Sequence, residues 1–198
     1  MEAFSPIDLA WLILAIVAVG QLVVIGKRDF MTQKITNSSV GLLLLTAGAI
    51  RAVDFIAHHD QFGLDRTGII NLEASTILAV VFFSFMFVFW LMRKVGAGDV
   101  KLLSVTAFLI GFQFSMIFAI LLLACTVITY AIMKQPMLLP ERMFREYVAS
   151  LARFEKVPFG VPISTAAVLT IAYAISTRFY LDASASSVFE FLESLQFQ

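Results

Sequence analysis

The sequence predicts an all-α protein that crosses a membrane with about six helices. Hydrophobic residues make up 60% of the 198 residues and charged residues only 14%, and the mean hydropathy is +0.92. Soluble domains are about 45–50% apolar and about 25% charged. The apolar residues also gather in long runs, and a helix needs about 20 of them to cross a bilayer. Composition and patterning therefore both indicate a polytopic membrane protein, with the lipid bilayer as its surroundings.

Each long apolar run is a candidate membrane span. Five runs have a suitable length, and they cover residues 9–26, 40–57, 74–92, 113–133 and 159–179. A sixth run, 99–111, is shorter and meets the next one at Gly111-Phe112-Gln113, where we expect a tight reversal. No internal repeat or low-complexity linker interrupts the chain. We therefore expect residues 1–198 to form a single membrane-embedded domain.

The distribution of charge predicts that the amino terminus lies outside. Basic residues gather in the segments that would then face the cytoplasm: Lys27, Arg28, Lys34, Arg93, Lys94, Lys134, Arg142, Arg145, Arg153 and Lys156. Acidic residues gather in the opposite segments: Glu2, Asp8, Asp60, Asp65, Asp182, Glu190 and Glu193. Cytoplasmic segments of membrane proteins carry an excess of lysine and arginine.

Two amphipathic stretches lie outside the predicted spans. Residues 141–155 place aromatic and aliphatic side chains at helical spacing, with arginines on the other side. This pattern is typical of a basic helix on the cytoplasmic leaflet. Residues 188–197 repeat it weakly on the outer side. We expect both stretches to be surface anchors, although their roles stay open.

Several polar groups near the spans have ordinary explanations. Arg51 and Asp54 are three residues apart, so they can pair on one helical face and extend outward. The adjacent His58 and His59 lack the spacing of zinc ligands, and Cys125 is the only cysteine. We therefore expect no metal and no cofactor, and nothing in the sequence indicates nucleic-acid binding.

Two aspartates are harder to explain by structure alone. Asp29 follows the first predicted span, and Asp99 opens the fourth. The predicted topology places both at the cytoplasmic rim on different helices. Two carboxylates that share a proton can hydrolyse a peptide, because one activates water as a base while the other donates to the scissile carbonyl. An aspartic peptidase needs no metal, cysteine or serine nucleophile.

Each aspartate also has a structural alternative. Asp99 could be the N-cap of its helix, and Asp29 could be a counter-ion to Lys27 or Arg28. The glycines Gly96 and Gly98 favour catalysis, because a backbone without Cβ atoms leaves room for an extended peptide. From these residues alone both interpretations stay open.

Three segments together resemble the signatures of prepilin peptidases, which are GxGD-type intramembrane aspartic proteases. The segment that begins at Gly96 reads GAGDVKLL, and the segment from Asp29 to Asn37 follows the pattern D-x-x-T-x-K-I-x-N. The third segment, Val157–Pro162, resembles the proline- and glycine-containing entry to the family's last span. The three occur in the expected order and extend over most of the chain.

The resemblance implies a peptidase that removes short basic leaders from prepilins or pseudopilins at the cytoplasmic face of the bacterial inner membrane. Asp29 and Asp99 match the two catalytic aspartates. The residues that match substrate-binding or motif-support positions are Gly96, Gly98, Lys101, Lys34, Asn37 and Gly160. The particular prepilin, the residue after the cut and whether the protein forms a homo-oligomer stay open.

Two departures from the family pattern refine this expectation. Larger members carry a methyltransferase region with paired CxxC zinc ligands, which this sequence does not contain, so it resembles the small Flp/Tad-type form. The first signature usually reads Ile-Pro-Asn, and Thr36 stands here in place of the proline. This change loosens the backbone without affecting the acid.

A second class of function is compatible with the same aspartates. A six-span transporter or a pilus-assembly scaffold could use Asp29 and Asp99 to bind a cation or a proton. Transporters usually place such acids near the bilayer midplane, whereas these are expected at the rim. The rim position favours the peptidase.

The helix dipole suggests which aspartate is ionised. Asp99 opens a helix, whose positive end favours a carboxylate, whereas Asp29 would follow a negative end if the first helix stopped near Gly26. On that premise we expect Asp99 to be the base and Asp29 the protonated partner.

Overall fold

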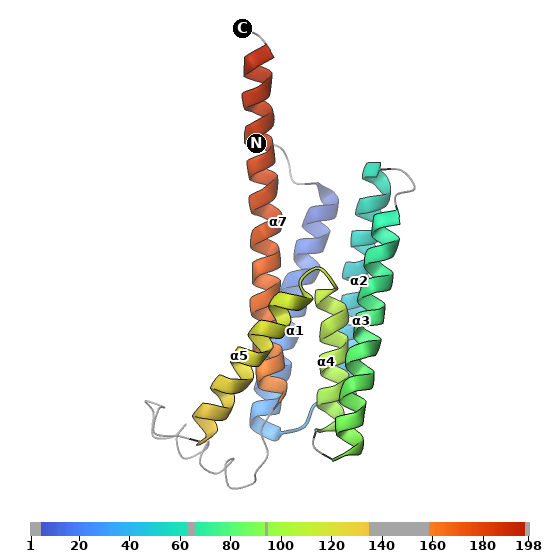
Figure 1. Cartoon of the computed structure of the whole chain (residues 1–198), viewed down its shortest axis with the longest axis vertical. Helices are drawn as coiled ribbons and strands as arrows, with labels where there is room; N and C mark the ends of the chain where they lie inside the picture. The colour runs from blue at the N-terminus through green and yellow to red at the C-terminus, as the bar shows by residue number, and fades with distance from the viewer. Residues whose placement is uncertain (1–4, 63–65, 94, 135–158, 197–198) are drawn as a thin grey trace.

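The computed structural model of the chain describes residues 5–62, 66–93, 95–134 and 159–196 (Figure 1). These residues form six helices and, within those ranges, no strand, which confirms the predicted all-α class. The helices are α1 (Pro6–Thr32), α2 (Asn37–Phe62), α3 (Arg66–Leu91), α4 (Ala97–Ile110), α5 (Ser115–Lys134) and α7 (Gly160–Gln196).

Five of these helices are long and apolar enough to cross a membrane, and α4 is not among them. Its 14 residues extend for about 21 Å, less than the hydrocarbon core of about 30 Å. The predicted reversal after it is confirmed, because turns occupy residues 111–114 and Gly111 has a φ of 77°. The hairpin of α4 and α5 therefore turns back part-way along the bundle, while α1, α2, α3 and α7 continue past its tip (Figure 1).

Two helices extend beyond the predicted spans. Helix α1 continues through Asp29 to Thr32 and ends at Gln33, which has a φ of 51°. Helix α7 does not end at residue 179 but continues to Gln196, so the backbone of the amphipathic stretch 188–196 prolongs the last span. The predicted surface helix 141–155 lies outside the described residues.

Helix α4 packs against α2, α3, α5 and α7, and helices α1 and α7 form the most extensive pair. Small side chains allow α1 and α7 to approach closely, as is common between helices in membranes. The buried residues Ala15, Ala18, Ala166 and Ala167 of these two helices belong to the hydrophobic core. A Cβ atom at Gly26 would lie 3.1 Å from the Cβ of Ser164.

Residues of all three predicted signature segments lie at the same end of the bundle. The carboxyl end of α1 and the amino ends of α2, α4 and α7 meet at the lower end of the view in Figure 1. Asp29, Asp99 and Gly160 belong to these helix ends. The basic residues Lys27, Arg28 and Lys34 are exposed there.

Candidate active site

Asp29 lies in the last turn of α1, and its side chain is held by the first residues of α7. The residue is only 4% exposed. Its Oδ2 atom accepts a hydrogen bond of 2.9 Å from the backbone N–H of Gly160, and the N–H of Val161 also donates to this carboxylate. The first N–H groups of a helix have no partners within the helix and readily bind anions. Asp29 therefore caps a helix that follows it by 131 residues along the chain.

Gly160 is glycine because the Asp29 carboxyl group occupies the space of a side chain. A Cβ atom at Gly160 would lie 2.7 Å from Asp29 Oδ2 and 2.8 Å from Asp29 Cγ. Any larger residue would displace the carboxylate or the start of α7. Gly160 thus leaves room for the Asp29 carboxyl group.

Asp99 lies in the first turn of α4 but is not its N-cap. The N-cap is Gly96, which has extended backbone angles. The Asp99 carboxylate reaches back and accepts a hydrogen bond from the N–H of Gly96, as an acidic side chain at the third helical position does in a capping box. A Cβ atom at Gly96 would lie 2.9 Å from Asp99 Oδ2. Gly96 therefore accommodates the acid itself.

Gly98 does not present the open backbone that we expected for a bound peptide. A Cβ atom at this position would lie 3.0 Å from the Cβ of Ile35, in the loop between α1 and α2. Ile35 packs directly on the first turn of α4. The function of Gly98 is thus to let this loop approach the Asp99 helix.

The negative charge of Asp29 acts on the Asp99 carboxyl group, although α1 and α4 are not neighbouring helices in the bundle. In the described part of the chain, no Cα atom of α1 lies within 8 Å of a Cα atom of α4. Helices α2 and α7 each contact both of them. The two acids therefore lie on separate helices that share neighbours, and two carboxyl groups whose charges affect each other can share a proton.

The other motif residues lie around this pair. Lys101 Nζ donates a hydrogen bond of 3.1 Å to Asn37 Oδ1, which ties the start of α4 to the start of α2. The Lys34 side chain is exposed. Thr36 replaces the usual proline as the cap of α2, since its carbonyl accepts from the N–H of Val40 at 3.3 Å. Ile35 and Val161 lie within the predicted signature segments, but the sequence indicated no role for either: Ile35 packs against Gly98, and the N–H of Val161 favours the charged form of Asp29.

The dipole argument for Asp29 rested on a wrong helix end. Because α1 continues to Thr32, Asp29 does not follow a helix terminus. The terminus that faces Asp29 is the positive end of α7, which favours a charged carboxylate.

The described side chains contain no group of three or more His, Cys, Asp or Glu residues that could hold a metal ion. The chemistry that the described site offers is that of two interacting carboxyl groups held by backbone N–H groups. These features define a polytopic membrane protein with a paired-carboxylate site at one end of its helix bundle.

Comparison with known families agrees with this class. A sequence model of the type IV leader peptidase family matches residues 11–133, and the chain belongs to this family. It is therefore a membrane-embedded prepilin leader peptidase, a hydrolase that acts on prepilins. The matched range contains both Asp29 and Asp99, whereas Gly160 lies beyond it. No curated protein and no solved structure matches the chain.

Proposed function

We propose that the protein cleaves the short basic leader from Flp-like prepilins, with Asp29 and Asp99 activating water between them. One observation carries this proposal. The acids of the two signature segments interact at one end of the bundle, and backbone N–H groups hold each of them. The family match supports a hydrolase and lends no support to the transporter or scaffold alternative.

We assign the ionised form to Asp29, which reverses the expectation from the sequence. Asp29 accepts a hydrogen bond of 2.9 Å from the N–H of Gly160 at the start of α7, and such a bond stabilises a carboxylate. Burial, and then the negative charge of Asp29, raise the pKa of Asp99 to about 6. Two carboxylates that repel each other retain one proton between them, and we place it on Asp99.

The reaction then follows general acid–base chemistry. Asp29 takes a proton from water, whose oxygen attacks the scissile carbonyl, while Asp99 donates its proton to the carbonyl oxygen. The tetrahedral intermediate collapses when Asp99 recovers this proton and Asp29 passes its own to the leaving nitrogen. The peptide bond is broken, one water is consumed, and both acids return to their starting states.

We place the site at the cytoplasmic face of the bacterial inner membrane, with the amino terminus outside. The exposed basic residues Lys27, Arg28 and Lys34 lie at the same end as Asp29. The cytoplasmic preference of such residues supports this orientation. We also propose that residues 1–198 act as a single peptidase domain.

The test is leader cleavage by the purified full-length protein with a prepilin of the small Flp type. We expect Asp29→Asn and Asp99→Asn each to lower the rate by at least about 10²–10⁴-fold, as for a lost acid or base. The matched control is Glu73→Gln, which changes an exposed acid of α3 and is expected to leave the rate unchanged. EDTA is also expected to have no effect. A near wild-type rate in either aspartate variant would refute the proposed mechanism.

A further inference from the structure

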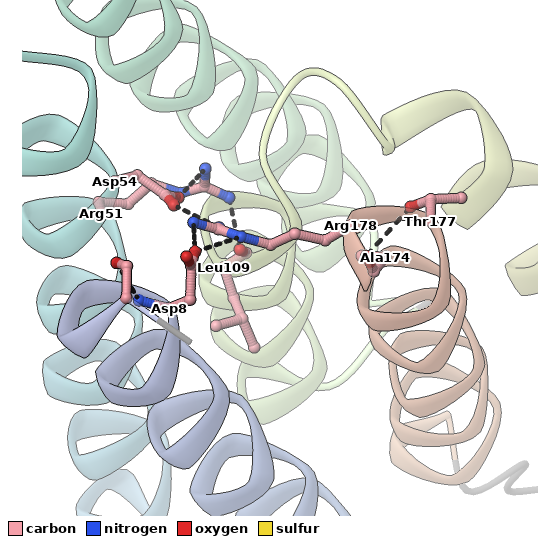
Figure 2. Close-up of polar contacts among 8 residues, drawn as sticks. Asp8, Arg51, Asp54, Leu109, Ala174, Thr177 and Arg178 are labelled. Atoms are coloured by element: carbon pink, nitrogen blue, oxygen red, sulfur yellow. Dashed lines mark hydrogen bonds and ion pairs between the residues drawn. The ribbon is translucent and has the colours of Figure 1, made fainter. Parts of the chain in front are cut away.

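Arg51 does not extend outward from α2 as the sequence suggested, but points inward to the end of α4. Its side chain is only 14% exposed. Its Nε atom donates a hydrogen bond of 3.1 Å to the carbonyl of Phe108, and its Nη2 atom donates to the carbonyl of Leu109 (Figure 2). The last carbonyls of a helix accept no hydrogen bond from an N–H of the same helix, and they carry partial negative charge. Arg51 therefore caps the carboxyl end of α4 from a different helix.

The turn that follows α4 is shaped around this arginine. A Cβ atom at Gly111 would overlap Nη2 of Arg51, and Gly111 has a φ of 77°. The next residue is also held, because the N–H of Phe112 donates to Ser75 Oγ of α3 at 3.3 Å. The reversal that follows α4 is thus fixed by polar side chains of α2 and α3. Backbone that leaves a helix at membrane depth requires such partners.

The same arginine belongs to a chain of ion pairs that joins α2 to α7 and α7 to α1 (Figure 2). Arg51 Nη1 lies 3.4 Å from Asp54 Oδ2, and Asp54 Oδ1 lies 3.4 Å from Arg178 Nη1 of α7. Arg178 Nη2 lies 2.8 Å from Asp8 Oδ1 of α1. These four residues, Asp8, Arg51, Asp54 and Arg178, form what we call the outer ion-pair chain. It connects α1 and α7 with the end of α4.

This connection matters because α1 and α4 carry the two acids and are not neighbouring helices in the bundle. Asp99 and the capped carbonyl of Leu109 belong to one short helix, about 15 Å apart along its axis. A helix of this length moves as a rigid element, so a shift or rotation at its carboxyl end also moves Asp99. The outer ion-pair chain holds the carboxyl end of α4 and thereby affects the distance between the carboxyl groups of Asp29 and Asp99, which lie at the other end of the bundle.

We propose that Arg51 is a positioning residue for catalysis, which sets the depth and rotation of α4 and thereby the placement of Asp99 against Asp29. This inference rests on the proposed roles of the two aspartates. It predicts a specific kinetic signature. Loss of Arg51 lowers kcat, because the acids are misplaced for the chemical step, while KM changes little, because Arg51 lies far from the rim where the leader is cut.

A cavity beside Arg51 makes a chemical rescue experiment feasible. It has a volume of about 320 Å³, and its lining includes Arg51, Arg178, Trp11 and Phe112. Truncation of Arg51 to alanine would leave space for a free guanidinium ion next to the carbonyls of Phe108 and Leu109. A guanidinium ion can donate to both carbonyls at once, whereas ammonium and sodium cannot reproduce this planar geometry.

The experiment compares kcat and KM of the full-length Arg51→Ala protein with and without guanidinium at millimolar, non-denaturing concentration. We expect a loss of about 10–100-fold in kcat, the scale of a misplacement near 1 Å, and recovery of most of it with guanidinium but not with equal ammonium or sodium. Arg51→Lys keeps the charge without the planar fork, so we expect a partial loss that guanidinium does not repair. This second variant covers the case in which Arg51→Ala fails to fold.

The matched control is Thr46→Val, which removes the hydrogen bond of 2.9 Å from Gln21 Nε2 on α1 to Thr46 Oγ1 on α2 without involving α4. It is expected to lower thermal stability while kcat stays constant and insensitive to guanidinium. A wild-type kcat in Arg51→Ala would overturn the positioning role. A loss of kcat that guanidinium fails to restore would also overturn it. If Arg51→Ala does not fold, a wild-type kcat in Arg51→Lys would overturn it. An active Asp99→Asn measured in parallel would instead refute the proposed dyad, so the two failures are distinguishable.

Discussion

At the scale of single residues, the site depends on close approaches that only glycine permits. Gly160 and Gly96 lie directly against the carboxyl groups of Asp29 and Asp99, so each glycine accommodates one acid. The hydrogen bonds that hold the acids come from backbone N–H groups. Such donors are fixed by the helices that carry them and do not depend on side-chain rotamers.

This arrangement predicts that Gly160→Ala inactivates the enzyme without preventing its insertion. The added Cβ atom would lie 2.7–3.0 Å from three atoms of Asp29, so the carboxyl group must shift. We expect a loss of about 10²-fold in the rate of leader cleavage. Gly41→Ala is the matched control, because a Cβ atom there meets nothing within 4 Å. Equal rates in the two variants would contradict the close approach.

At the scale of elements, the position of α4 is fixed at both ends. Ile35 packs on its first turn at Gly98, Lys101 bonds to Asn37 of α2, and Arg51 caps its last carbonyls. A helix of 14 residues that does not cross the whole membrane needs such contacts. The structure provides them from α2 and from the loop before it.

The contact between Ile35 and Gly98 can be tested by second-site rescue. Gly98→Ala places a Cβ atom 3.0 Å from the Cβ of Ile35, which is overpacked and costs about 1–3 kcal/mol in the free energy of unfolding. We expect Gly98→Ala also to slow leader cleavage, because it shifts the helix that carries Asp99. Ile35→Gly in the same chain removes the opposing Cβ atom and is expected to recover part of this stability and activity. Thermal unfolding and leader cleavage of the single and double variants measure this. If the double variant were no more active than Gly98→Ala, the effect of Gly98→Ala would not come from a steric overlap with Ile35.

The elements also show how far the sequence could predict the structure. The spans followed from apolar runs, and the reversal at residue 111 followed from a glycine between two runs. The end of α1 was misplaced because Lys27, Arg28 and Asp29 interrupt the apolar pattern, although lysine and arginine continue a helix readily. The contact between Asp29 and Gly160 joins residues 131 positions apart, and local patterns carry no information about such a pairing. The inward turn of Arg51 was missed for the same reason.

At the scale of the whole molecule, charge and site chemistry are separated along the bundle. The proposed catalytic end carries exposed lysine and arginine residues, and the opposite end carries the outer ion-pair chain. The first end is the one that we assign to the cytoplasm. A prepilin leader that remains in the cytoplasm would then lie at the end of the bundle that holds both aspartates.

Cysteine labelling in intact cells tests this orientation. In a Cys125→Ser background, Ser5→Cys places a thiol at the exposed cap of α1, and Ser38→Cys places one at the exposed start of α2. A membrane-impermeant reagent is expected to label position 5 in intact cells and position 38 only after the cells are opened. The reverse pattern would put the aspartates on the outer face.

The most direct test of the central claim is the rate of leader cleavage by the double variant Asp29→Asn/Asp99→Asn, compared with the two single variants. Catalytic residues that act as a unit are strongly non-additive. If the two acids share one reaction, removal of the second costs little once the first is gone, so we predict a double variant about as slow as either single variant. Single losses that multiply in the double variant would mean that the aspartates act independently, and would contradict the shared mechanism.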